Sequence, residues 1–229
     1  MPLSASSLLS SGLFGDLEAS LRAQIAEQCV GYSYATGETV LCCADQGQDV
    51  YFILAGAVQV TNFMAAGKQV TFRDLGPGDM FGLLSAIDGQ PRSAFVVARD
   101  PVNIARMSAC DFKSLIARDG RINERVLCHL AGLVRALTER VNEYGSMSVR
   151  QRLYAELLRL ACSDAAVADH GRISPAPTHA DLATRIATHR EAVTRELRQL
   201  SRQGIVSKQC GELVIRDLPQ LRQLLQPAG

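Results

Sequence analysis

The chain has 229 residues, of which 47% are hydrophobic, so it is long and apolar enough for one large domain or two small ones. No apolar run approaches the roughly 20 residues that cross a bilayer, and no basic flank precedes the first leucines as in a secretory signal. We therefore expect a cytoplasmic protein with no membrane partner. The net charge is only +1, but residues 145–229 hold 12 basic and 8 acidic side chains, against 12 and 15 in residues 1–144. A positive second half indicates a polyanionic partner.

The seven cysteines show neither a CxxC pair nor the spacing of a zinc site. Most are therefore expected to be reduced packing residues, although the adjacent Cys42 and Cys43 leave a redox-sensing role open. No Ser-His-Asp set, metal triad or acid pair stands out along the chain, so we expect a protein that is not an enzyme.

The first third of the chain changes from helical to β texture. Residues 13–31 place leucines, a phenylalanine and an isoleucine on a helical period, which predicts a short amphipathic lead-in. From Tyr32, short β-branched segments follow one another between glycine turns: YFILAGAVQVTNF, KQVTFRDL and SAFVVARD. Evenly spaced short strands of this kind predict an all-β barrel or sandwich, which we expect over residues 1–108.

Near Pro101 the β texture fades, and residues 109–144 are predicted to form one long helix. Its apolar residues recur at steps of four, three, four and four, namely Val126, Leu130, Leu133, Leu137 and Val141. A narrow stripe of this kind is typical of a coiled-coil seam between two identical chains, but it is equally typical of a helix that packs on its own barrel. Residues 145–148, GSMS, are predicted to interrupt the helix as a hinge, and a further helix is expected from residue 149 to about 166.

Residues 178–206 have the pattern of a helix-turn-helix. Thr178 is a good N-cap with Asp181 in the capping-box position, and the turn falls near residues 187–188. The second helix, over residues 189–203, has an apolar stripe on one side and charged side chains on the other: Arg190, Glu191, Arg195, Arg198 and Arg202. An arginine at the start of such a helix can bond the two major-groove acceptors of guanine, and a glutamate can accept from cytosine. The alternative is a solvated basic face on an ordinary helical hairpin.

Two apolar segments around Gly211 are predicted to form the strands of a small wing, and the polar stretch DHGRISPAPT before the motif is predicted to be a loop. The last segment is expected to be a short amphipathic helix. The fold class is therefore α+β: a β-barrel over residues 1–108, a dimerisation helix and hinge over 109–145, and a winged helix-turn-helix over 146–229. Because operator half-sites repeat about one turn of DNA apart, the motif itself favours a homodimer through residues 109–144.

Two motifs, DMFGLLSAIDGQPRSA at residues 79–94 and THREAVTR at residues 188–195, resemble the Crp-Fnr superfamily of bacterial transcription factors. The resemblance covers nearly the whole chain. It implies a cyclic-nucleotide-binding jelly roll, a homodimer, binding to double-stranded DNA and contact with RNA polymerase. Other branches of the family hold an iron-sulfur cluster or haem, but the cysteine spacing does not match and His129 is the only histidine before residue 145, so we expect neither cofactor and no metal.

In this family the first motif is a phosphate-binding cassette. The resemblance assigns to a cyclic nucleotide or dinucleotide the residues Gly82, Leu83, Leu84, Arg92, Ser93, Ala94, Leu137 and Thr138. A helix N-terminus, a guanidinium and a hydroxyl suit a phosphodiester. Leu83 is a departure, because relatives that bind cyclic AMP usually have a glutamate there to accept from the ribose hydroxyl. Weaker cyclic-AMP binding, another cyclic nucleotide, or a vestigial pocket in a nucleotide-independent or redox-responsive regulator all stay open.

The second motif matches the residues that read base pairs in the cyclic-AMP receptor branch. The resemblance implies contact with an inverted repeat of TGTGA-like half-sites, and the residues assigned to DNA are Thr178, Thr188, His189, Arg190, Glu191, Thr194 and Arg195. Three of the four histidines, His170, His179 and His189, also fall in this half, where we expect them at the surface or against phosphate.

Overall fold

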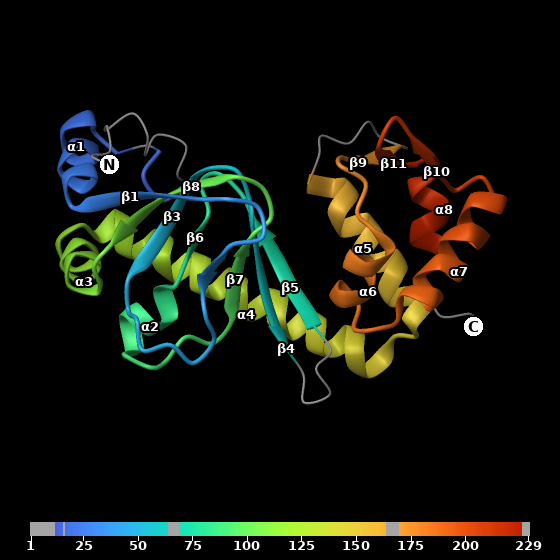
Figure 1. The fold of residues 1–229 in the computed structure, drawn as a ribbon, viewed down its shortest axis with the longest axis horizontal. Coiled ribbons are helices and arrows are strands. Elements are labelled where there is room, and N and C mark those ends of the chain that lie inside the picture. The colour runs from blue at the N-terminus through green and yellow to red at the C-terminus, as the bar shows by residue number, and fades with distance from the viewer. Residues whose placement is uncertain (1–11, 16, 64–68, 164–169, 226–229) are drawn as a thin grey trace. The chain divides into compact units, whose positions relative to one another are not determined.

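A computed structural model of the chain describes residues 12–15, 17–63, 69–163 and 170–225 (Figure 1). The chain divides into two compact units: residues 1–62 with 72–135, and residues 63–71 with 136–229. No described helix is long and apolar enough to cross a membrane.

Two four-stranded antiparallel sheets form the β-rich part of the molecule (Figure 1). The first, in the order β1-β8-β3-β6, consists of Cys29–Tyr34, Val102–Met107, Val50–Ala55 and Met80–Phe81. The second, in the order β2-β7-β4-β5, consists of Thr39–Leu41, Phe95–Ala98, Val58–Phe63 and Gln69–Leu75. Two sheets of short strands joined by glycine turns confirm the predicted β-sandwich or barrel.

Alternation along β3 separates two hydrophobic cores, because successive side chains of a strand point to opposite faces of the sheet. Tyr51 and Ile53 belong to a core built wholly from strand residues and their connections. Val50 and Phe52 belong to a second core that includes helical residues. The helices of this unit are α1 (Ala19–Glu27), α2 (Leu83–Asp88), α3 (Ala109–Arg118) and the start of α4 (Gly120–Ser146).

Three boundaries in this region differ from the prediction. The lead-in is helical only in α1, since residues 29–31 already pair with β8. The strand β8 was missed because Asn103 and Arg106 interrupt its apolar run, yet it pairs with both β1 and β3 and buries Val102 and Ile104. The predicted helix over residues 109–144 is two helices, because the Asp119 carboxylate accepts from the main-chain nitrogens of Arg121 at 2.9 Å and Ile122 at 3.3 Å and so begins α4 anew.

The apolar stripe of α4 is divided between two faces. Val126 is buried, and Leu130 and Leu133 pack against the same core, so this part follows the alternative of a helix on its own barrel. Four other apolar side chains of α4 are 54–68% exposed, namely Leu127, Val134, Leu137 and Val141. With Leu130 and the part-exposed Tyr144 they repeat at steps of three and four, which is the spacing of a coiled-coil seam.

The second unit is a winged helix-turn-helix, as predicted. It contains α5 (Val149–Ser163), α6 (His179–Arg185), α7 (Arg190–Arg202) and α8 (Leu218–Gln223). A three-stranded sheet completes it, in the order β10-β11-β9, from Val206–Gln209, Glu212–Ile215 and Gly171–Ile173. The break between α4 and α5 comprises only residues 147–148, so Gly145 and Ser146 of the predicted hinge are helical. The predicted end of α5 near residue 166 lies outside the described residues.

The strand β9 lies in the stretch that was predicted to be a loop. Three residues are too few to show a period, and only the pairing of Ile173 with Leu213 reveals the strand. Gly171 is required here, because an added Cβ would lie 2.8 Å from the Cβ of Ala161 on α5.

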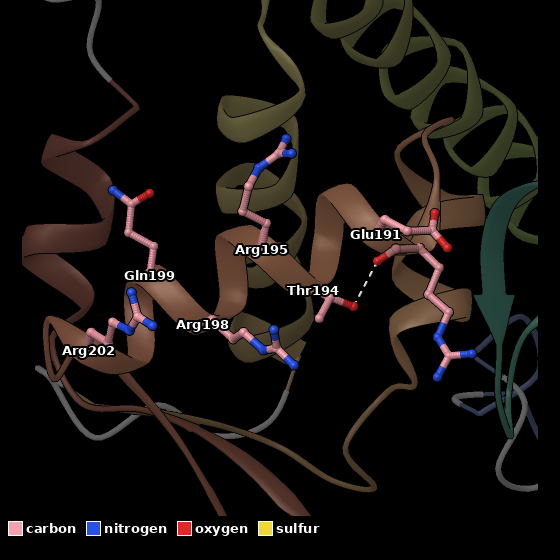
Figure 2. A pocket seen from close by; sticks show the side chains of 7 residues that line it. Glu191, Thr194, Arg195, Arg198, Gln199 and Arg202 are labelled. Atoms are coloured by element: carbon pink, nitrogen blue, oxygen red, sulfur yellow. Dashed lines mark hydrogen bonds between the residues drawn. The ribbon is translucent and has the colours of Figure 1, made fainter.

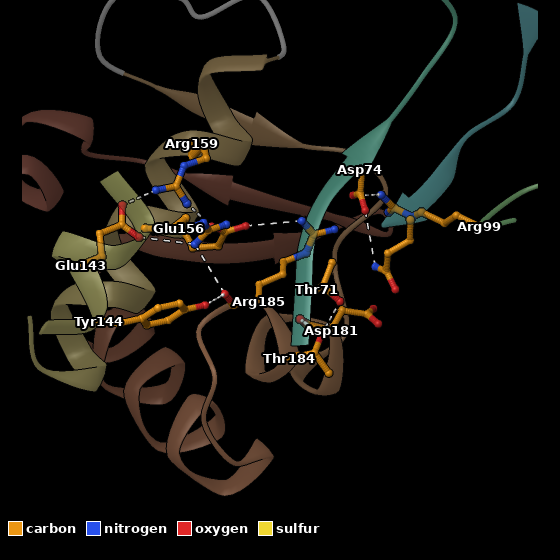
Figure 3. A network of polar contacts seen from close by, with 12 residues as sticks. Thr71, Asp74, Arg99, Glu143, Tyr144, Glu156, Arg159, Asp181, Thr184 and Arg185 are labelled. Carbon is orange, nitrogen blue, oxygen red and sulfur yellow. Dashed lines mark hydrogen bonds and ion pairs between the residues drawn. The ribbon is translucent and has the colours of Figure 1, made fainter. Parts of the chain in front are cut away.

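A buried carboxylate joins α4, α5 and α6 within this unit (Figure 3). Glu156 of α5 is only 1% exposed and pairs with three guanidinium groups. Arg140 lies at 2.8 Å and Arg185 at 3.4 Å, and Arg159 completes the set. Glu143 accepts from two of the same arginines, and the Tyr144 hydroxyl donates to the main-chain oxygen of Arg185 at 3.2 Å. The last turns of α4 are thereby fixed to the first helix of the helix-turn-helix.

Replacing Glu156 with glutamine should lower the free energy of unfolding of this unit by about 3–5 kcal/mol, because it removes the carboxylate that pairs with the buried Arg185 and one of the two that pair with Arg140 and Arg159. Urea denaturation followed by circular dichroism measures this. The matched control is Glu212→Gln, which removes an exposed 3.7 Å pair with Arg172 and should cost less than about 1 kcal/mol. Equal effects of the two substitutions would contradict the role given to Glu156.

Candidate nucleic-acid interface and ligand site

The turn between α6 and α7 is set by local hydrogen bonds. Thr178 caps α6, since its hydroxyl accepts from the Asp181 nitrogen at 3.1 Å and its own nitrogen donates to the Asp181 carboxylate at 3.0 Å. Ala187 has a φ of +51° at the turn, and the Thr188 nitrogen donates to the main-chain oxygen of Ala183 at 2.9 Å. The predicted capping box and turn are both confirmed.

Helix α7 has one apolar side and one charged side. Val193, Leu197 and Leu200 are buried in the core of the unit. The opposite side lines a shallow surface hollow formed by Arg190, Glu191, Thr194, Arg195, Arg198, Gln199 and Arg202 (Figure 2). Because this charged side begins at the helix N-terminus and carries four arginines, it has the donors that phosphates and guanine edges require.

The structure brings four of the predicted DNA-binding residues to this face: Arg190, Glu191, Thr194 and Arg195. His189 is exposed as the N-cap of α7, and Thr188 is half-buried in the turn. Three further residues of this face, Arg198, Gln199 and Arg202, were not among the residues predicted to bind DNA. Their helical spacing from Glu191 and Arg195 is the sequence signal that could have identified them.

A second hollow adjoins the first, between α6, α7 and the wing. Its polar lining comprises Thr178, His179, Arg190, Arg198, Ser201, Ser207 and Lys208. The His179 Nδ1 lies 2.7 Å from the Thr194 hydroxyl, which also donates to the main-chain oxygen of Arg190 at 2.9 Å. Burial, and then the charges of Arg190, Lys208 and Arg198, lower the pKa of His179 below its usual 6.5.

Arg92 of the predicted phosphate cassette is buried, with 4% of its surface exposed. Its two terminal nitrogens donate to the main-chain oxygens of Gly82 and Asp49, each at 2.8 Å. Its Nε is buried with no hydrogen-bond partner among the described residues. Burial lowers the pKa of Arg92, although the nearby Tyr51 and Asp49 act in the opposite direction. Gly82 has a φ of +80°, and a Cβ there would lie 2.7 Å from the guanidinium, so this close approach requires glycine.

The other cassette residues take different positions. Ser93 is exposed and Ala94 half-buried, and the main-chain oxygen of Ser93 accepts from Asn62 at 3.4 Å. Leu84 is 46% exposed, whereas Leu83 is buried in the core that includes helical residues. Leu137 and Thr138 are exposed on α4, in the part of the chain assigned to the second unit.

The cysteines and the other residue types that bind metals differ in exposure. Among them, no group of three or more His, Cys, Asp and Glu side chains could hold a metal ion. Cys42 is exposed and Cys43 half-buried, while burial, together with the charge of Asp111, raises the pKa of the Cys29 thiol to about 12. Cys29 is therefore held in its protonated, unreactive form.

Comparisons with known proteins identify a family for each of the two parts of the chain. The cyclic nucleotide-binding domain family matches residues 32–119, and the Crp-like helix-turn-helix domain family matches residues 151–224. A "CRP-like cAMP-activated global transcriptional regulator" of Mycobacterium tuberculosis is 26% identical over 216 residues, which cover 93% of this chain and 96% of that protein.

Solved structures show the same fold. FixK2 from Bradyrhizobium japonicum superposes with a TM-score of 0.75 at 22% identity, over 88% of this chain and 99% of that one. A CooA variant from Carboxydothermus hydrogenoformans gives a TM-score of 0.78 at 17% identity, over 99% and 97%. The chain belongs to the Crp-Fnr superfamily of transcription regulators, with a cyclic-nucleotide-binding domain followed by a Crp-like helix-turn-helix domain.

Proposed function

We propose that this protein is a homodimeric, sequence-specific transcription factor of the cytoplasm, whose affinity for DNA is set by a small anionic ligand in the β-domain. The charged face of α7 carries the proposal. Within the described part of the chain, no ion pair involves Arg190, Arg198 or Arg202, so their donors are available to an outside anion. The operator we infer is an inverted repeat of TGTGA-like half-sites, and RNA polymerase is the partner through which the bound dimer would act.

Arg190 is the residue that we assign to a base contact, and its exposure at the first position of α7 supports this. Truncation of Arg190 to alanine should weaken binding to the inverted repeat by about 1–3 kcal/mol and remove discrimination at one base pair. Fluorescence anisotropy at fixed salt, with the repeat and a scrambled duplex, measures both effects. Arg222→Ala, an exposed arginine on α8, is the control and should change neither. An unchanged preference in Arg190→Ala would refute the base contact.

The exposed stripe of α4 is the proposed dimer interface. Leu127, Leu130, Val134, Leu137, Val141 and Tyr144 follow the three-four repeat of a two-stranded coiled coil. A second copy of this chain is the occupant that an inverted-repeat operator calls for, since two recognition helices must reach two half-sites.

A charge within this stripe should separate the dimer. In Val141→Glu two like charges would meet across the seam, so we expect a monomer and loss of tight DNA binding, as each half-site would be bound alone. Sedimentation equilibrium measures the mass. Val30→Glu, which charges an apolar residue of β1 that is 46% exposed, should stay dimeric. A Val141→Glu protein that remains dimeric would refute the proposed dimer interface.

The environment of Arg92 supports the proposal of an anionic ligand. A buried guanidinium whose terminal nitrogens donate to main-chain carbonyls and whose Nε has no hydrogen-bond partner among the described residues is costly, and a phosphodiester would supply a negative charge and an acceptor. The six-residue α2 adds little dipole, so the guanidinium and the Ser93 hydroxyl are the groups we assign to the phosphate. The cyclic-AMP response named for the Mycobacterium tuberculosis relative makes a cyclic nucleotide the first ligand to test, and a cyclic dinucleotide the second.

A nucleotide-independent regulator of the same architecture is the second candidate, because Leu83 is part of the hydrophobic core. A buried leucine cannot accept the sugar hydroxyl bond that a glutamate makes. Such a regulator would bind its operator equally well with and without nucleotide.

Arg92→Gln should abolish nucleotide-stimulated DNA binding and leave ligand-free binding unchanged, because glutamine keeps a donor but has no charge. We expect one of cyclic AMP, cyclic GMP or a cyclic dinucleotide to raise wild-type affinity at least about tenfold, or roughly 1.4 kcal/mol of coupling. Arg99→Gln, which removes the surface pair with Asp74, should respond like wild type. A wild-type protein that ignores all three ligands would establish the second candidate instead.

A further inference from the structure

The two hydrogen bonds of the Thr194 hydroxyl favour one tautomer of the His179 imidazole. A threonine hydroxyl has one hydrogen, and in Thr194 it is donated to the main-chain oxygen of Arg190 at 2.9 Å. With that hydrogen on the Arg190 oxygen, the hydroxyl is an acceptor toward His179, so the 2.7 Å contact favours the tautomer that carries its proton on Nδ1. In the neutral ring Nε2 is then a bare acceptor.

Cations surround this ring. Arg190 and Arg198 of α7 and Lys208 of β10 act on it electrostatically and line the same hollow. On its own helix, the carboxylate of Asp181 is engaged by the nitrogen and hydroxyl of the Thr178 cap. The positive neighbours and partial burial oppose a further charge, which is why the pKa of His179 is lowered in the free protein.

The hollow is also the position where a DNA backbone would lie. It adjoins the charged face of α7 and includes Ser207 and Lys208 of the wing, so it offers cations and hydroxyls to a phosphate beside the base-reading helix. A neutral His179 would present a lone pair to that phosphate, whereas a protonated ring would present an Nε2 donor and a charge. A phosphate also offsets the three cations that disfavour protonation.

We propose that His179 is a proton-coupled phosphodiester contact, in which the ring takes up a proton from solvent at Nε2 and donates it to a phosphate oxygen while Nδ1 stays on Thr194. The inference rests on the proposed DNA binding and adds its regulation by pH. Each protomer then takes up one proton when it binds its DNA half-site. The contact involves no base, so it strengthens binding to DNA of any sequence.

The direction of the pH dependence follows from linkage. The free-state pKa lies below the usual value of about 6.5, and the bound-state pKa lies above the free-state one. DNA binding takes up protons only at pH values between these two pKa values. Affinity for DNA therefore rises as the pH falls through that window, and it is constant above and below it.

The test uses the full chain, with an inverted-repeat duplex and a scrambled duplex, at pH 6.0 and 8.0 and one ionic strength. Because two sites act together and one unit of pKa shift is a factor of about ten, wild type should bind both duplexes about tenfold or more tightly at the lower pH. His179→Asn should show no pH dependence on either duplex, since the asparagine amide can still donate to Thr194 but does not titrate. His129→Asn, which replaces the half-buried histidine of α4 outside the helix-turn-helix, is the matched control and should behave like wild type.

Each other outcome overturns the inference. A pH dependence that persists in His179→Asn, or that disappears in His129→Asn, assigns the proton to another group. Sequence-specific binding by wild type that does not change with pH refutes the proton coupling and leaves the proposed function standing. Failure to prefer the inverted repeat at either pH refutes the proposed function as well.

Discussion

The second unit depends on one buried carboxylate. Glu156 is the acceptor on which guanidinium groups from the end of α4, from α5 and from α6 converge, and a charge at that depth is tolerable only because each group finds an opposite charge. The cost of breaking such a cluster resists independent movement of these helices. The recognition helix α7 is joined to α6 by a short turn, so its orientation relative to the end of α4 is set by the same charges. The two-residue break at 147–148 is therefore bridged by side chains, and the hinge at residues 145–148 stays a prediction.

The helix-turn-helix could be predicted from the sequence because its determinants are local. Thr178 and Asp181 cap one helix through neighbouring main-chain groups, and the apolar period of Val193, Leu197 and Leu200 separates the buried side of α7 from the charged side. The β-sandwich was predictable as a class for a similar reason, since short β-branched runs between glycines have few other stable arrangements.

What sequence reasoning missed depends on partners far along the chain. The strand β8 is held by β1 and β3, and its own residues show only a weak alternation. The division of the α4 stripe depends on which residues meet the core, so Val126 and Val141, four turns apart, serve different surfaces. Likewise nothing near Glu156 in the sequence announces three arginines, and nothing near His179 announces Thr194, because both sites form only when α6 is placed. The sequence identified the arginine of the cassette, but only the structure shows that Leu83 is packed in the core and that Nε of Arg92 is left without a partner.

Two sets of arginines in this protein have different roles. Around Glu156, each guanidinium is matched by a carboxylate within the chain, and the result is a fixed arrangement of helices. The terminal nitrogens of Arg92 donate to main-chain carbonyls, and the arginines along α7 line an open hollow. A positive charge that the chain does not neutralise raises the energy of the free state and lowers it again when an anion binds, so affinity for anions is greatest where internal pairing is least. The same reasoning applies to His179: it lies among unneutralised cations, stays uncharged without DNA, and becomes a cation when the phosphate backbone supplies the missing negative charge.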